Sequence, residues 1–117
     1  MDEKTFKDRT KKYGLAVICL TEKLPKTMTS DVLGRQILRP ATSIGANYRA
    51  ACRAKSAADM INKLKIVEEE ADETLYWLEL LQETLPMAEI PALAKEGNEL
   101  LAMAVASIKT LRLRKSS

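Results

Sequence analysis

The sequence predicts an all-α protein that folds, over residues 1–117, as a single four-helix bundle in antiparallel up-down-up-down order. Apolar residues recur at steps of three and four along four long segments. Alanine, leucine, glutamate and lysine dominate while aromatic residues make up only 4% of the chain, which favours helix. Four prolines and four glycines are too few for many turns. Short connections between long helices make consecutive helices antiparallel neighbours.

The first two helices are expected at residues 4–24 and 31–52. The first carries an apolar stripe and ends where Pro25 stops it. Ser30 is a good N-cap for the second. Pro40 lies inside the second helix and is expected to kink it or to start a new segment, because proline lacks the amide proton and clashes with the preceding turn. The stripe of the first helix consists of Phe6, Tyr13, Val17, Leu20 and Leu24.

The third and fourth helices are expected at residues 56–85 and 91–113. Ser56 and Asp59 resemble a capping box at the start of the third helix, which ends before Pro86. Pro91 suits the first position of the fourth. Their apolar stripes are Met60, Leu64, Val67, Ala71, Leu75, Leu78 and Leu85 on the third helix, and Leu93, Leu100, Ala104, Ile108 and Leu111 on the fourth.

The bundle topology separates charge along the molecule. One end collects the start of the first helix, the end of the second, the start of the third and the end of the fourth. We call this end the basic pole, because it holds 14 of the 19 basic residues and four of the 16 acidic ones, a net charge of +10 in a chain of +3. Its basic residues are Lys4, Lys7, Arg9, Lys11, Lys12, Arg49, Arg53, Lys55, Lys63, Lys65, Lys109, Arg112, Arg114 and Lys115.

The basic pole predicts binding of nucleic acid. Basic residues at helix C-termini complement the helix dipole, but helix starts prefer acids, and here two helix starts are basic as well. Phosphate backbones bind largely through such charges. Because aromatic side chains are scarce, we expect recognition of the backbone or of shape rather than base stacking. The expected binding residues are Lys4, Lys7, Lys11, Lys12, Arg49, Arg53, Lys55, Lys63, Arg112, Arg114 and Lys115.

The sequence favours a protein without catalytic activity, metal or cofactor. It has no histidine, and Cys19 and Cys52 form no paired motif, so both are expected to be free thiols. The acidic run within residues 68–73, with Glu96 and Glu99, is open to two interpretations. Facing carboxylates hold Mg²⁺ in all-α nucleotide pyrophosphatases. Alternatively they form salt bridges, with Arg39 level with Glu69 and Glu70, and Arg35 level with Glu73; this is the interpretation we favour.

The run from Leu75 to Leu81 is apolar on more than one face of its helix. Such a helix is buried on several sides, which in a small bundle indicates a homo-oligomer. Trp77 is expected either to anchor the subunit interface or to lie within the core. The expected interface residues are Tyr76, Trp77, Leu80 and Leu81. No segment is long and apolar enough for a membrane span and no signal peptide is present, so we expect a cytoplasmic protein.

A combination of short motifs runs from Gly34 to Leu81. The motifs are Gln-x-x-Arg, Ser-Ile-x-x-Asn, an Arg-Glu-like pair, Ser-x-x-Asp, Lys-Leu-x-x-x-x-x-Glu and Glu-x-x-x-Trp-Leu. In this combination the chain resembles a bacterial family of four-helix bundles, first named for proteins encoded in intervening sequences of 23S ribosomal RNA genes. The matching positions are Gln36, Arg39, Ser43, Ile44, Asn47, Arg49, Ser56, Asp59, Lys63, Leu64, Glu70, Glu73, Trp77 and Leu78.

The resemblance implies a homopentameric barrel of four-helix protomers. It also implies kinship with the accessory variability proteins of diversity-generating retroelements, which are basic pentamers that bind nucleic acid and a reverse transcriptase. The chain departs from the family pattern at Ala50, where glutamate is usual. This difference removes a carboxylate beside Arg49 and makes that corner more basic.

Taken together, these features predict a non-enzymatic, oligomeric helical adaptor that binds RNA or DNA through the basic pole, and the resemblance adds a reverse transcriptase as partner. Two alternatives stay open. One is a protein-interaction scaffold that uses the Leu75–Leu81 surface, with the basic pole serving only solubility. The other is a Mg²⁺-dependent nucleotide pyrophosphohydrolase.

Overall fold

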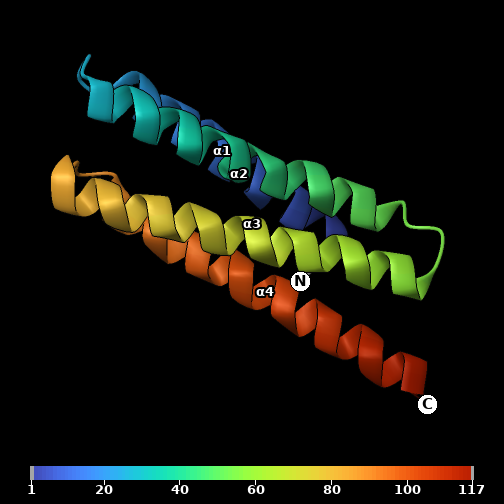
Figure 1. Cartoon of the computed structure of the whole chain (residues 1–117). Coiled ribbons are helices and arrows are strands. Elements are labelled where there is room, and N and C mark those ends of the chain that lie inside the picture. Colours follow the sequence, from blue (N-terminus) through green and yellow to red (C-terminus); the bar gives the residue numbers. More distant parts are fainter. Residues whose placement is uncertain (1, 117) are drawn as a thin grey trace.

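The computed structural model describes residues 2–116, with side chains for residues 2–114, and over this range four helices form. They are α1 (Glu3–Glu22), α2 (Met28–Cys52), α3 (Ala57–Thr84) and α4 (Ile90–Ser116). No strand occurs between residues 2 and 116, so the predicted all-helical fold is confirmed. The bundle measures 53 × 21 × 20 Å, and Figure 1 shows consecutive helices running in opposite directions. The α1–α2 and α3–α4 connections lie at one end, and the α2–α3 connection at the other.

Side-chain caps set the starts of α2 and α3. Ser56 caps α3 as predicted, because its Oγ accepts a hydrogen bond from the Asp59 amide at 3.0 Å. The prediction of Ser30 as the cap of α2 is wrong. Thr27 takes that place, since its Oγ1 accepts from the Ser30 amide at 3.1 Å and donates to Ser30 Oγ at 3.0 Å. Serine and threonine both cap helices well. Because Ser30 is buried inside the bundle, the helix that begins after Thr27 is favoured over one that begins after Ser30.

Pro40 lies within α2 without ending it. The helix is continuous from Met28 to Cys52, so the predicted alternative of a new segment is wrong. The proline ring is fully buried. Thr42 Oγ1 adds a hydrogen bond of 2.7 Å to the Leu38 carbonyl in the same stretch. Packing of the buried ring and the helical hydrogen bonds on either side of Pro40 therefore outweigh the one backbone hydrogen bond that proline removes.

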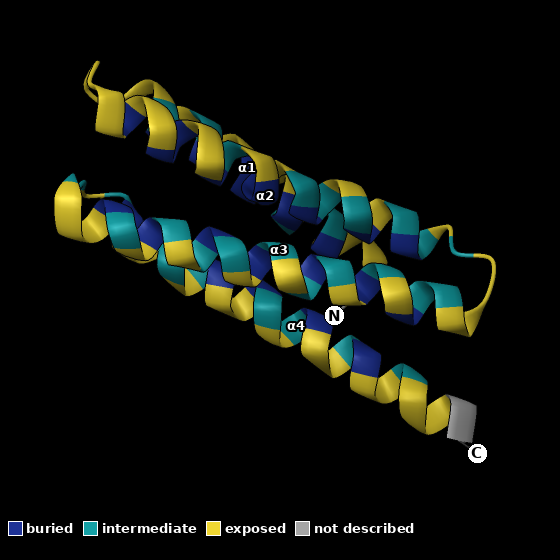
Figure 2. Ribbon diagram, in the orientation of Figure 1, coloured by how far each residue is buried: buried dark blue, intermediate teal, exposed yellow. Residues whose placement is uncertain are grey.

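The core runs the length of the bundle, and Figure 2 shows the buried stripe of each helix turned inward. Near the start of α1, Phe6 stacks on Tyr48 of α2 with ring centroids 4.1 Å apart. Where α1 meets α4, the Tyr13 hydroxyl donates a hydrogen bond of 3.1 Å to the Leu93 carbonyl. Burial raises the pKa of Tyr13, so this hydroxyl keeps its proton. Among the described residues, no helix has the length and apolar character needed to cross a bilayer.

Candidate nucleic-acid interface

Four of the predicted binding residues surround one open groove on the seam between α1 and α2. Lys4, Lys7 and Lys11 lie on one face of α1, and Arg49 comes from the last turn of α2. The groove has a volume of 590 Å³, and its other lining residues are Thr5 and Asp8. The Phe6–Tyr48 stack joins the same two helices on their inner side. The fold thus gathers cations that lie about 40 residues apart in the sequence.

The ion pairs beside this groove are weak. Lys7 lies 3.6 Å from Glu3, and Lys12 lies 3.0 Å from Asp8, each one turn away on α1. The side chains of Lys7 and Lys12 are 37% and 73% exposed, so solvent screens both pairs. Such pairs exchange readily for contacts to a phosphate, and they leave the groove positively charged.

A second groove of 360 Å³ continues along the same seam, away from the helix ends. It shares Lys11 and Arg49 with the first groove. Its floor is formed by small residues, and Leu15, which is 52% exposed, stands beside it. The basic surface therefore passes into an apolar one along the α1–α2 seam. The other lining residues are Thr10, Gly14, Ile18, Thr42, Gly45 and Ala46.

The other predicted binding residues are spread over several surfaces. Arg53 and Lys55 are exposed at the α2–α3 connection, while Lys63 is half-buried on α3. Arg112 and Arg114 are exposed on α4 but line two different grooves, one beside Glu68 and Glu69 and one beside Phe6 and Tyr48. The side chain of Lys115 lies outside the described residues. Among the predicted binding residues whose side chains the structure describes, Lys4, Lys7, Lys11 and Arg49 share one groove.

Arg9 does not contribute a free charge to the basic pole. Its guanidinium donates to Glu96 on α4, with Nε 2.9 Å from Oε2, and its Nη2 lies 2.9 Å from Glu99 Oε1. These two carboxylates raise the pKa of Arg9. Arg9 therefore ties α1 to α4. The sequence could not reveal this, because the two helices are about 90 residues apart.

The acidic run on α3 forms salt bridges with α2; the predicted Arg39–Glu70 pair is confirmed, whereas the predicted Arg35–Glu73 pair is wrong. Arg39 Nη2 lies 3.3 Å from Glu73, and Arg39 Nη1 lies 3.9 Å from Glu70, so Glu73 pairs with Arg39 rather than with Arg35. Arg39 reaches both Glu70 and Glu73, which lie about one turn apart on α3. Burial raises the pKa of Glu70, against the opposing effect of Arg39, and its Oε2 is buried without a hydrogen-bond partner. Among the described residues, no group of three or more acidic or thiol side chains could hold a metal ion.

Only some of the predicted oligomer-interface residues are exposed on the protomer. Tyr76 is 52% exposed and packs edge-on against Trp77, with ring centroids 5.1 Å apart. Trp77 is half-buried and its Nε1 donates to Glu73 Oε2 at 3.1 Å. Leu80 is half-buried as well. Leu81 is fully buried in the protomer's own core, so its prediction as an interface residue is wrong. The prediction treated the apolar run as one surface, although its residues lie on two different faces of α3.

Comparisons with known proteins show the family of this chain and a solved structure with the same fold. The model of the 23S rRNA-intervening sequence protein family matches residues 4–106. A crystal structure of a protein with unknown function from the S23 ribosomal protein family of Bacteroides thetaiotaomicron superposes with a TM-score of 0.85 and 37% sequence identity. That match covers 93% of this chain and 99% of the other. No curated protein matches the chain. The family match includes the groove residues Lys4, Lys7, Lys11 and Arg49 but ends before Arg112 and Arg114.

Proposed function

The chain belongs to the 23S rRNA-intervening sequence protein family, and from this premise we propose that it is a cytoplasmic, non-enzymatic, oligomeric adaptor that binds RNA or DNA at its basic pole. The observation that carries this proposal is the groove in which Lys4, Lys7, Lys11 and Arg49 meet. Phosphate contacts from such residues supply affinity without reading sequence. We therefore propose binding to the backbone, common to many sequences.

The spacing of the lysines suits a phosphate backbone. Lys4 and Lys11 are seven residues apart on one helix, which corresponds to about 10 Å along its axis. One strand of a duplex carries a phosphate about every 3.4 Å of helix axis, so this distance spans about three phosphates. Because both lysines belong to α1 and Arg49 is fixed by the packing of α2, little order has to be gained on binding.

The aromatic residues near the basic pole support backbone binding rather than base stacking. Phe6 and Tyr48 are 3% and 7% exposed and already stack on each other. Tyr13 is 2% exposed and points into the α1–α4 seam. None of these three rings offers an open face to a base, and single-strand binders of the stacking type need such faces.

Reversing two groove charges tests this proposal. The variant Lys11→Glu/Arg49→Glu is expected to weaken binding to a structured RNA and to a DNA duplex by roughly tenfold or more. The slope of log Kd against log salt should fall by about 2, because each lost phosphate contact removes about one unit. The measurement is a salt series by fluorescence anisotropy with the purified protein.

The matched control changes the same charge at the opposite end of the bundle. Lys26 and Lys95 are both exposed there. The variant Lys26→Glu/Lys95→Glu should retain most of the affinity and the parent's salt slope. If the groove variant binds as tightly as the parent, or if both variants lose equally, nucleic acid does not bind in the α1–α2 groove.

We further propose that the protomers assemble into a homopentamer and act beside a reverse transcriptase. Both parts rest on the resemblance to the family and to the accessory proteins of diversity-generating retroelements. The exposed Tyr76, beside the half-buried Trp77 and Leu80, supports a subunit contact on α3. The same surface favours the second candidate function, a protein-interaction scaffold, if the protein binds no nucleic acid.

The oligomer is tested by the molar mass in solution. We expect a species of five times the protomer mass of 13.0 kDa in sedimentation equilibrium. The variant Tyr76→Glu should shift the mass toward the protomer, because it places a charge in the apolar contact. Leu113→Glu changes a residue that is 67% exposed on α4 and should leave the mass unchanged. A parent protein that stays monomeric at high concentration would contradict the proposal.

A further inference from the structure

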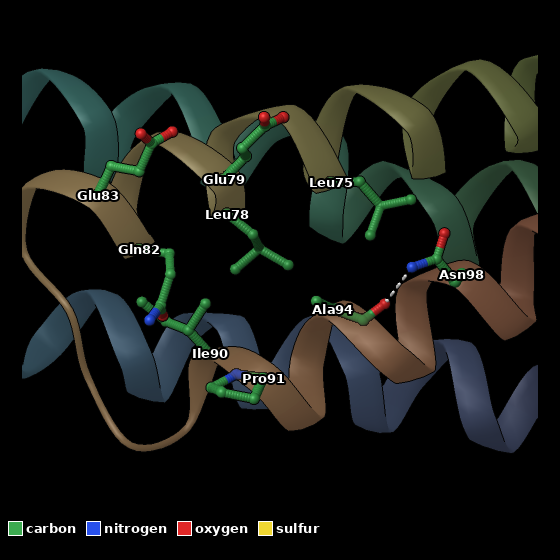
Figure 3. A pocket seen from close by; sticks show the side chains of 9 residues that line it. All are labelled: Leu75, Leu78, Glu79, Gln82, Glu83, Ile90, Pro91, Ala94 and Asn98. Atoms are coloured by element: carbon green, nitrogen blue, oxygen red, sulfur yellow. Dashed lines mark hydrogen bonds between the residues drawn. The ribbon is translucent and has the colours of Figure 1, made fainter.

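A groove between α3 and α4 lies near the α3–α4 connection, at the end of the bundle opposite the basic pole. We call it the α3–α4 groove, and its volume is 530 Å³. Figure 3 shows Leu75 and Leu78 on the α3 side facing Ile90, Pro91 and Ala94 of α4. These side chains give the groove an apolar floor. The lining residues include none of the basic pole and none of the proposed subunit contact at Tyr76, Trp77 and Leu80.

We propose that the α3–α4 groove docks a basic amphipathic helix of a partner protein. The charge beside the groove selects this occupant. Glu79 and Glu83 lie one turn apart on the α3 wall, and both are exposed. Within residues 2–114, neither forms a salt bridge with a lysine or an arginine. Two uncompensated carboxylates above an apolar floor attract a helix that carries basic residues beside an apolar stripe.

The dimensions of the groove suit a helix. The lining residues of α3 span residues 75–83 and those of α4 span residues 90–98, which is about 12 Å or two helical turns on each wall. A third helix packs into the groove between two others when its side-chain ridge fits that space. Glu79 and Glu83 are spaced as i and i+4, so they face basic residues with the same spacing on the docked helix.

Charge also excludes nucleic acid as the occupant. The carboxylates of Glu79 and Glu83 would repel phosphates, whereas Lys4, Lys7 and Lys11 attract them at the other end of the bundle. The two surfaces are thus separated along the 53 Å length of the bundle. A partner helix in the α3–α4 groove would leave the basic pole free, which is the arrangement an adaptor needs.

The test uses a synthetic helical peptide of about 15 residues, with leucines on one face and lysines beside them. We expect saturable binding to the purified protein by fluorescence anisotropy. The variant Glu79→Lys/Glu83→Lys should weaken binding by roughly tenfold. The control Glu68→Lys/Asp72→Lys makes the same change in charge, with the same spacing, on α3 outside the groove, and should weaken it by less than about twofold. Equal losses in both variants would overturn the proposal.

A second pair of variants tests the apolar floor without changing charge. Ala94→Trp fills the groove and should abolish peptide binding, whereas Ala92→Trp places the same side chain on an exposed position of α4 outside it. A peptide of the same composition with its leucines scattered should bind roughly tenfold more weakly. If both peptides bind alike, the contact is only electrostatic and the proposal fails. Self-association that is lost in Glu79→Lys/Glu83→Lys would identify a second copy of this chain as the occupant, which also overturns it.

Discussion

Replacing Leu100 by alanine is expected to lower the free energy of unfolding by about 2–5 kcal/mol. Leu100 is 0% exposed and belongs to the α4 stripe that packs into the core. Its truncation removes buried methyl groups and leaves a cavity, because the neighbouring helices are held by their own contacts and cannot collapse fully. The measurement is urea unfolding followed by circular dichroism, with the slope m expected to stay at the parent value.

The matched control for this substitution is Leu113→Ala on the same helix. Leu113 is 67% exposed, so its truncation removes little buried surface. Its effect should stay within about 0.5 kcal/mol. A Leu100→Ala variant as stable as Leu113→Ala would mean that α4 does not pack against α1 and α3 as described.

Gly97→Ala is expected to destabilise the protein by about 2 kcal/mol, although alanine normally favours a helix over glycine by about 1 kcal/mol. An added Cβ at this buried position would lie 2.6 Å from Tyr13 Oη and 3.0 Å from Leu75 Cδ2. Tyr13 is 2% exposed and its hydroxyl is bonded to the Leu93 carbonyl, so the ring cannot move without losing that bond. The clash therefore outweighs the gain in helix propensity.

Two further variants separate the clash from the propensity. The double variant Gly97→Ala/Tyr13→Phe lacks the Tyr13 hydroxyl that meets the added Cβ. Its loss of stability should therefore be about 1 kcal/mol smaller than the sum of the losses in the two single variants. Gly34→Ala is the control, because its Cβ would meet Leu24 at 3.6 Å in ordinary contact. It should be neutral or stabilise the protein by up to about 1 kcal/mol. Additive effects in the double variant would refute the clash as the cause.

Local features of the fold could be predicted from the sequence because they depend on neighbours along the chain. Apolar stripes at steps of three and four predict helices, and Ser56 followed by Asp59 predicts the start of α3. The start of α2 shows the limit of such reasoning. Thr27 and Ser30 are both good caps, and local preference does not choose between them. Burial of Ser30 in the bundle decides for Thr27.

At the candidate site, the structure differs from the sequence-based predictions because of contacts between helices that are distant in the sequence. The sequence placed Arg9 with the other cations of the basic pole, but the α1–α4 contact joins it to Glu96 and Glu99. The apolar run on α3 placed Leu81 beside Tyr76, but helix geometry turns Leu81 inward and Tyr76 outward. One periodic pattern cannot assign faces when apolar residues surround most of a helix.

Four antiparallel helices, with most of the positive charge at one end, could be predicted because periodicity and short connections act along the chain. Which cations share a surface depends on how the helices pack in three dimensions. Lys4, Lys7, Lys11 and Arg49 meet because α1 packs on α2 in the register that also stacks Phe6 on Tyr48. Glu79 and Glu83 border an apolar groove because α3 packs on α4. Register and rotation of packed helices depend on the fit of many side chains at once, which no local pattern contains.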